Sequence, residues 1–319
     1  MGSNIKVFTG ATKALSVDQF FDYMSDIQGG ANDAATLFGK VSWLFRAVNL
    51  RSDAMGRMPY SVWQGDEEYE WPIHLAKVLR VVESDLCLSG AGYVLKRESS
   101  VELKDLQRLN PWTMTVLTKP EAGLTEEVGG LYGFKQKISG GAKPKYFKPG
   151  EVLYFDHFYN PKDDVGPGVG PASVCGLPSE LVHHMNEYAS GFFERGAVIP
   201  FVLKTDTVVP EDEQERLRSM FRRLYKGVKQ FFSTPLLQHG LDIAKLSDAP
   251  KDMAMPELED SSKKQIAAAF GIPPAMLEQQ DASHATAKAH QLSFYTETMI
   301  PEAQLFADTI NDTLMEPLD

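Results

Sequence analysis

Apolar side chains recur at helical spacing in several stretches of this chain, and each stretch stops at a glycine or a proline. Residues 41–57 carry the first stripe, which stops before a proline because the preceding residue then disfavours the helical conformation. Residues 73–88 carry a second stripe, which is broken at Ser89–Gly92. A third helix is expected from Pro178 to Arg195, since proline suits the first turn of a helix.

Between residues 93 and 155 the pattern changes to short alternating or apolar runs, separated by Gly, Pro, Asn and Lys. Such runs are typical of antiparallel strands with turns between them. The sequence therefore predicts a small antiparallel barrel or sheet. The expected strands are Tyr93–Arg97, Val101–Arg108, Thr113–Thr118, Leu131–Ile138 and Val152–Phe155. A separate strand is expected at Tyr60–Trp63, between the first two helices.

The chain then predicts a small α/β insert between two long helices. A helix that begins at Pro256 should end at Gly271, because glycine readily adopts the left-handed C-cap conformation and two prolines follow. The insert is expected to hold a strand in residues 197–209, a helix at Glu211–Lys226 and two short strands in residues 231–246. A further short helix is expected at Ser16–Ser25.

The segment Gln279–Ala289 is small and polar, with almost nothing to bury, and lies between two helical patterns. We expect a loop that presents backbone and short side chains to a partner. Helical spacing returns with Leu292, Tyr295, Met299, Phe306 and Ile310. Pro301 lies inside this pattern and should kink the helix.

Composition excludes several classes of protein. Of the 319 residues, 43% are hydrophobic and 24% charged, which is ordinary for a globular protein. The net charge of −11 argues against a protein that coats nucleic acid by neutralising phosphates. Two cysteines make no disulfide framework, which favours a reducing compartment. We expect neither a membrane span nor a secretory signal, because no apolar run approaches about 20 residues and the N-terminus lacks the signal pattern.

No catalytic motif accompanies these patterns. The GPGVGP loop at Gly166–Pro171 lacks the Lys-Ser/Thr ending of a phosphate loop, so a structural turn is the simpler interpretation. His183 and His184 are adjacent and should point to different sides of a helix. Four residues, Asp156, His157, Asp163 and Asp164, are the only support for an enzyme, but their spacing fits no metal site, and an exposed loop is expected.

Two charged groups each leave two interpretations open. The basic residues Arg218, Arg222, Arg223, Lys226 and Lys229 form either a solvated helix face or a surface for an acidic partner or DNA. On the helix expected from Pro256, Glu259, Lys263 and Lys264 either complement the helix dipole and pair at i,i+4, or form charged rings where many copies line a pore.

Seven segments, taken in order, resemble the portal proteins of tailed double-stranded DNA bacteriophages of the HK type. The resemblance runs from about residue 41 to the end of the chain and leaves the first 40 residues uncovered. GPGVGPAS departs from the usual Gly-x-Ser-Pro wording, and the chain stops soon after its last helix, so a C-terminal crown is expected to be short, absent or removed. The segments are VNLRSDAMGRMPYSVW, LCLSGAGYVLKR, LQRLNPWTMTV, VGPGVGPASV, EYASGFFERGAVIPFVLKTD, IAAAFGIPPAML with the polar ASHATAKA after it, and LSFYTETMIPEAQLFADTIN.

The resemblance implies an α+β portal fold that forms a ring, typically a dodecamer, at one vertex of the capsid in the virion, assembled in the host bacterial cytoplasm. It implies no enzyme activity, cofactor, metal or membrane contact. The implied partners are copies of the same chain, double-stranded DNA passing through the channel, the large terminase, the major capsid protein and a head–tail adaptor. The implied parts are an N-terminal segment (1–40), a wing (41–170), stem helices (171–195 and 251–275), a clip (196–250), a tunnel loop (276–289) and a kinked helix that returns to the wing (290–319).

In that reading the basic residues belong to the clip surface where partners dock, and the tunnel loop faces DNA. The loop residues expected to face DNA are Gln279, Gln280, Asp281, Ser283, His284, Thr286 and Lys288. A weakly polar lining would touch DNA without holding it, because each phosphate contact by Lys or Arg strengthens adhesion. Protonation of His284 would change that grip, or His284 is a plain exposed histidine. The alternative function is a non-enzymatic oligomeric adaptor or scaffold that does not act on DNA.

Overall fold

The computed structural model describes residues 34–64, 66–69, 74–98, 103–137, 143–194, 201–204, 212, 215, 216, 219, 242–245, 255–278 and 284–315. The chain divides into two compact units. The larger unit comprises Met1–Glu180 with Lys263–Asp319, and the smaller comprises Leu181–Ser262. The boundaries therefore fall inside two helices, α6 (Gly176–Glu194) and α8 (Met255–Ala269). The division into seven parts expected from the sequence remains a prediction.

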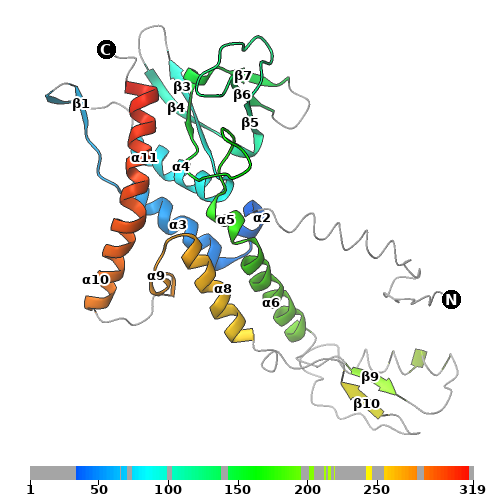
Figure 1. The fold of residues 1–319 in the computed structure, drawn as a ribbon. Coiled ribbons are helices and arrows are strands. Elements are labelled where there is room, and N and C mark those ends of the chain that lie inside the picture. Colours follow the sequence, from blue (N-terminus) through cyan, green and yellow to red (C-terminus); the bar gives the residue numbers. More distant parts are fainter. Residues whose placement is uncertain are drawn as a thin grey trace. The chain divides into compact units, whose positions relative to one another are not determined.

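The larger unit contains a pair of helices, α3 (Ser42–Gly56) and α4 (Leu75–Ser89), that pack against each other, with the short helix α2 (Ala34–Phe38) beside them (Figure 1). Most of each predicted apolar stripe is buried, including Leu44 and Val48 in α3 and Leu79 and Val82 in α4, but Phe45, expected in the α3 stripe, is 52% exposed. Helix α4 ends at Gly90, whose φ of 79° is left-handed and whose N–H bonds to the Leu86 carbonyl at 2.9 Å. Both predicted helices are confirmed.

The strands form two three-stranded antiparallel sheets, of order β4-β3-β8 and β5-β6-β7. Aromatic side chains pack in the core beside them: the Tyr93 ring centroid lies 5.8 Å from that of Phe134 and 5.1 Å from that of Tyr154. The strands are β3 (Gly92–Glu98), β4 (Leu103–Leu109), β5 (Met114–Leu117), β6 (Gly133–Gln136), β7 (Lys145–Phe147) and β8 (Val152–Phe155). Short 3₁₀ turns, η1 (Pro111–Thr113) and η2 (Pro149–Glu151), precede β5 and β8.

The six strands expected from the sequence are present, but the described residues form separate sheets instead of one barrel. The Asn110–Pro111 turn separates β4 from β5. The Asn110 side chain accepts the Trp112 N–H at 3.1 Å, and Pro111 has no N–H that could form a hydrogen bond to a neighbouring strand. Two strands were not expected, β7 and β2 (Glu67–Tyr69). Charged residues interrupt the alternation of apolar and polar positions in both strands. Strand β2 pairs with β1 (Val62–Gln64) in an exposed hairpin.

The predicted helix start at Pro178 is wrong. A short helix, α5 (Pro171–Val174), begins at Pro171, and α6 follows directly from Gly176. Pro178 is therefore the third residue of α6, where the missing N–H costs nothing because first-turn N–H groups have no intrahelical partner.

The smaller unit contains the antiparallel pair β9 (Phe201–Lys204) and β10 (Asp242–Lys245), which lie within two predicted strand regions. Of the predicted helix Glu211–Lys226, residues 212, 215, 216 and 219 are described and all are helical. The Ser16–Ser25 helix lies outside the described residues. Within the described part of the chain, every helix falls short of the length and apolar character that crossing a bilayer requires.

Candidate functional site

The polar segment picked out by the sequence is framed by helices from the larger unit. Before it come the end of α8 and the short helix α9 (Pro274–Glu278). After it comes a long continuous helical run, composed of α10 (His284–Ser293), the π-helical stretch η4 (Phe294–Met299), α11 (Ile300–Ile310) and a second π-helical stretch, η5 (Asn311–Met315) (Figure 1).

Helix α8 ends as the sequence predicts, in a Schellman motif. Gly271 has a φ of +63°, its N–H bonds to the Ala268 carbonyl at 3.1 Å, and the Ile272 N–H bonds to the Ala267 carbonyl at 2.9 Å. The cap also contacts the C-terminal helical run: the Thr298 hydroxyl donates to the Gly271 carbonyl at 2.7 Å. A Cβ at Gly271 would lie 2.7 Å from Thr298 Oγ1, so glycine is required by both conformation and space.

The prediction that residues 279–289 are all loop is wrong, because helix α10 begins at His284. Three alanines, at positions 285, 287 and 289, explain the difference. Alanine has the highest helix propensity, so a small and polar segment without Gly or Pro can extend a helix that it does not bury. The remaining segment is residues 279–283.

Pro301 does not break the helical run. It occupies the first turn of α11, directly after the π-helical stretch η4, where the Ile300 N–H bonds to the Tyr295 carbonyl five residues earlier. The wider π turn rearranges the hydrogen bonds next to the proline, which has no N–H of its own.

The structure places the predicted DNA-facing residues in two groups. Gln279, Gln280, Asp281 and Ser283 lie outside the described residues. His284 is the first residue of α10, and the side chains of Thr286 and Lys288 are exposed further along that helix. The clip residues Arg218, Arg222, Arg223, Lys226 and Lys229 also lie outside the described residues.

Lys263 differs from the other two stem charges. Its Nζ lies 2.6 Å from Glu278 Oε1 and 5.0 Å from the centroid of the Trp43 ring, so it joins α8, α9 and α3. Glu278 is the last residue of α9, directly before residues 279–283. Lys263 therefore anchors the start of the candidate segment, whereas Glu259 and Lys264 are exposed on α8.

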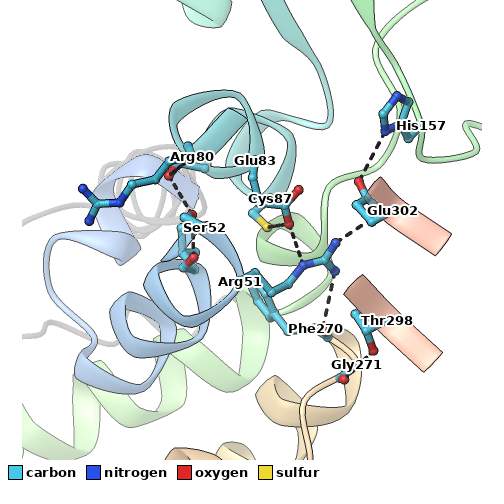
Figure 2. Close-up of polar contacts among 12 residues, drawn as sticks. Arg51, Ser52, Arg80, Glu83, Cys87, His157, Phe270, Gly271, Thr298 and Glu302 are labelled. Carbon is cyan, nitrogen blue, oxygen red and sulfur yellow. Dashed lines mark hydrogen bonds and ion pairs between the residues drawn. The ribbon is translucent and has the colours of Figure 1, made fainter. Parts of the chain in front are cut away.

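A buried charge cluster, formed by Arg51, Glu83, Glu302 and His157, anchors the other side (Figure 2). Arg51 Nε donates to Glu83 Oε1 at 2.7 Å, and Arg51 Nη2 lies 3.4 Å from Glu302 Oε2. Arg51 Nη1 also donates to the Phe270 carbonyl at 3.4 Å, at the end of α8. One guanidinium thus joins α3, α4, α8 and α11.

Burial sets the electrostatics of this cluster. Desolvation raises the pKa of Glu83, although its pairing with Arg51 acts in the opposite direction. Glu83 Oε2 is buried and has no hydrogen-bond partner among the described residues, which disfavours its charged form further. Burial also raises the pKa of the Cys87 thiol well above its usual range. Cys87 Sγ donates to Glu83 Oε1 at 3.4 Å and is an inert part of the packing.

The predicted acidic loop does not form a metal site, and its exposed-loop interpretation is wrong for His157. The His157 side chain is 5% exposed and contacts Glu302. Asp163 instead shapes the loop by accepting the backbone N–H groups of Val165 and Gly166, which lowers its pKa. Among the described residues no group of three or more His, Cys, Asp or Glu side chains is arranged to hold a metal.

Two other sequence interpretations can be compared with the structure. The GPGVGP loop is a structural turn: the Gly168 N–H bonds to the Gly90 carbonyl at 3.1 Å, and a Cβ at Gly170 would lie 2.7 Å from the Leu86 carbonyl oxygen. The expectation that His183 and His184 diverge is wrong. Their ring centroids lie 5.5 Å apart, and each imidazole has a nitrogen within 3.4 Å of the Glu187 carboxylate. Adjacent side chains on a helix can meet in this way because their torsions bring the rings to one side.

Sequence reasoning missed the cluster, although a signal was present. Arg51 lies on the apolar stripe of α3 between Val48 and Met55, and Glu83 lies beside Val82 on the stripe of α4. A charge on a buried stripe requires a partner. The sequence alone does not show that Glu302, more than 200 residues away, supplies it.

Solved structures with a similar fold include chains of gene transfer agent particles and a phage portal protein. The fold resembles a chain in the neck of an empty gene transfer agent (GTA) particle, computed with C6 symmetry, with a TM-score of 0.60 and 19% identity over 88% of this chain and 80% of that one. It also resembles an HK97-family phage portal protein from Corynebacterium diphtheriae, with a TM-score of 0.54 and 16% identity over 82% and 85% of the two chains. The mixed helix–sheet fold with a long C-terminal helix is that of the portal proteins.

Residues 42–319 match the family described as phage portal protein, and the chain belongs to that family. It is 26% identical to an uncharacterized protein of Rickettsia felis over 84% of this chain and 73% of the relative. It is 24% identical to a probable portal protein of Streptomyces phage phiC31, over 77% of this chain and 56% of that protein.

Proposed function

We propose that this chain assembles into a ring, expected to be a dodecamer, that forms the DNA channel at one vertex of a phage capsid. Double-stranded DNA would be packaged through this channel by the large terminase and would later leave through it. The same ring would contact the major capsid protein and a head–tail adaptor, and would be assembled in the bacterial cytoplasm before it becomes part of the virion. The ring itself would have no catalytic role.

Family membership over residues 42–319 carries this proposal. A neck of a native GTA particle, computed with C12 symmetry, contains a chain of the same fold, with a TM-score of 0.56 and 19% identity. Twelve copies of one chain around an axis would present twelve copies of each channel-facing residue. The net charge of −11 suits such a ring, because a strongly basic lining would hold DNA by its phosphates.

The helical frame supports a DNA-facing role for residues 279–283 and the start of α10. Both sides of the segment are anchored, by Lys263–Glu278 before it and by the Arg51 cluster after it. Helix α10 exposes Thr286 and Lys288 together with small alanines, and so offers few groups that could hold a phosphate. Anchored flanking helices and a weakly polar composition suit a conduit.

Electron microscopy of the purified chain tests the ring directly. We expect class averages with a central hole, and light scattering should give a mass many times that of one chain. A monomer or dimer at every salt concentration would contradict the ring. The alternative, an oligomeric adaptor or scaffold that does not act on DNA, also predicts a ring, so a second experiment must distinguish the two functions.

A deletion of residues 280–283 separates the two functions. The deleted residues belong to neither α9 nor α10 and to neither anchor, so we expect assembly to be retained. In a packaging reaction with terminase and capsids, the conduit function predicts reduced DNA packaging or retention. Normal packaging by rings that lack residues 280–283 would remove the role of the segment. A four-residue deletion in the exposed loop between β5 and β6 provides a matched control.

A further inference from the structure

The hairpin of β1 and β2 has little to pack against within its own chain. The two strands pair with each other, Val62 opposite Tyr69, and neither packs closely against another described helix or strand (Figure 1). The Trp63 side chain in β1 is 60% exposed. An isolated two-stranded hairpin is only marginally stable in water, and aromatic side chains are enriched at protein interfaces. The hairpin therefore has the properties of an arm that a partner completes.

The turn and the second strand of this hairpin are acidic. Asp66, Glu67 and Glu68 are exposed, and within the described residues no ion pair joins them to a cation. Glu68 lies opposite Trp63 and Glu67 opposite Gln64, so carboxylates stand on both faces of the hairpin. This charge argues against DNA as the occupant, because phosphates would be repelled. A fitting partner would offer cations beside a free strand edge.

Strand β7 is an edge of this kind. It is the outer strand of the sheet β5-β6-β7, and in the described part of the chain it pairs with β6 alone. Three exposed lysines, Lys143, Lys145 and Lys148, lie in it or next to it, and no described carboxylate forms an ion pair with them. Lysines on an edge strand disfavour pairing with most other strands. An acidic strand is the exception, because its charges complement theirs.

The geometry of a ring requires two different surfaces of this sort. In a head-to-tail ring, each copy contacts one neighbour through one surface and the other neighbour through a second surface. The hairpin and the edge of β7 belong to the same chain and do not pack closely against each other within it. They can therefore meet between copies, where the acidic arm of one copy reaches the basic edge of the next.

We propose that strand β2 of each copy adds to the free edge of β7 in the neighbouring copy. A sheet of order β5-β6-β7-β2-β1 would then cross every boundary between copies, with Glu67 and Glu68 beside Lys145 and Lys148 of the neighbour. Main-chain hydrogen bonds supply the attraction in strand addition, and the side chains determine which strand is accepted. This inference rests on the proposed ring and identifies a contact that holds it together.

Exchanging the charges between the two surfaces tests the contact. One variant carries Glu67→Lys with Glu68→Lys, and the other carries Lys145→Glu with Lys148→Glu. Alone, each variant places like charges together at every boundary, so the chain concentration at which rings form should rise by at least about tenfold. Mixed in equal amounts, the two variants should assemble again, because every boundary in an alternating ring then joins opposite charges. Light scattering and electron microscopy of the full chain measure assembly.

A matched control separates the contact from a change in net charge. Lys119→Glu with Lys162→Glu alters two exposed lysines elsewhere and should assemble as wild type does. If the hairpin and β7 variants each form rings at the wild-type concentration, or if their mixture does not assemble, the contact is wrong although the ring stands. A wild-type chain that forms no ring removes the proposed function and this contact together.

Hydrogen–deuterium exchange on wild-type rings supplies a measurement that needs no variant. Amides of β1, β2 and β7 should exchange more slowly in the ring than in the unassembled chain, because strand addition pairs the free edges. Equal exchange in the two states would overturn the contact. Protection of the hairpin that requires added major capsid protein would assign the hairpin to that partner and would overturn it as well.

Discussion

The two sides of residues 279–283 are anchored by different physical means. On the preceding side, Lys263 and Glu278 form one ion pair, with side chains 14% and 10% exposed, and Lys263 also lies over the Trp43 ring. On the following side, Arg51, Glu83, Glu302 and His157 form a cluster whose side chains are between 0% and 9% exposed. The first is a single pair at the edge of the core that joins α8, α9 and α3, and the second is a fully buried cluster that joins four elements.

The difference shows how burial changes what a charge contributes. At the edge of the core, the charges of an ion pair keep part of their hydration and salt screens them more than it screens buried charges, so we expect the loss of one partner to cost less. In the core, each charge has lost its hydration, so removing one partner leaves the others buried without a counter-charge and strongly destabilises the folded state. This holds even where the intact cluster stabilises the fold no more than apolar packing would. Mutations in the Arg51 cluster should therefore destabilise the fold strongly, and mutations of the Lys263–Glu278 pair only weakly.

The largest effect should come from Arg51→Met. It leaves the buried carboxylates of Glu83 and Glu302 without their shared cation, and we expect a loss of about 3–5 kcal/mol in the free energy of unfolding. Urea denaturation followed by tryptophan fluorescence measures it. Arg57→Met, at the exposed end of the same helix, should change the stability by no more than about 0.5 kcal/mol.

A triple variant shows whether stranded charge is the cause. Arg51→Met combined with Glu83→Leu and Glu302→Leu removes the carboxylates as well, so most of the lost stability should return. If the triple variant is as unstable as Arg51→Met, the cost comes from lost packing and the electrostatic account of the cluster is wrong.

The sequence predicts elements better than it predicts how they meet. Periodicity predicts α3 and α4, and glycine chemistry predicts the end of α8 at Gly271, because these features are local. The start of α10 is missed because alanines extend a helix that buries nothing. The Arg51 cluster is missed because its members are far apart in the chain, and only the fold shows which buried charge meets which. His157 attracts attention as a possible ligand, but its partners on α11 are invisible in the sequence.

The second largest effect concerns the contact between the end of α8 at Gly271 and Thr298 in η4. Gly271→Ala would place a side chain in the left-handed region at φ +63° and drive its Cβ against Thr298. We expect a loss of about 1–3 kcal/mol in the free energy of unfolding. Gly150→Ala is the control, since its Cβ would meet open space. Adding Thr298→Ala should recover only part of the loss, because the backbone strain remains; full recovery would show that the contact alone matters.

The third effect is a pH dependence confined to the buried cluster. Burial raises the pKa of Glu83, so the folded state holds that proton more tightly than the unfolded state does. The resulting stability is present below the usual pKa of glutamate, about 4.5, and is lost as the pH rises through the raised value. The wild-type free energy of unfolding, relative to that of Glu83→Gln, should therefore fall as the pH rises from 4.5. A flat difference would mean that Glu83 titrates as a free glutamate.

The smallest effect should come from the preceding side, and its salt dependence makes the comparison sharpest. Lys263→Gln removes the pair with Glu278 and the contact over Trp43, and we expect a loss of about 0.5–1.5 kcal/mol. Raising the salt concentration to about 1 M shortens the screening length to about 3 Å, so this loss should shrink, while that of Arg51→Met should stay nearly constant. The measurement is urea denaturation of both variants and wild type at low and high salt. Equal salt dependence in the two variants would mean that the two sides are anchored alike, and would contradict the contrast between a pair at the edge of the core and a fully buried cluster.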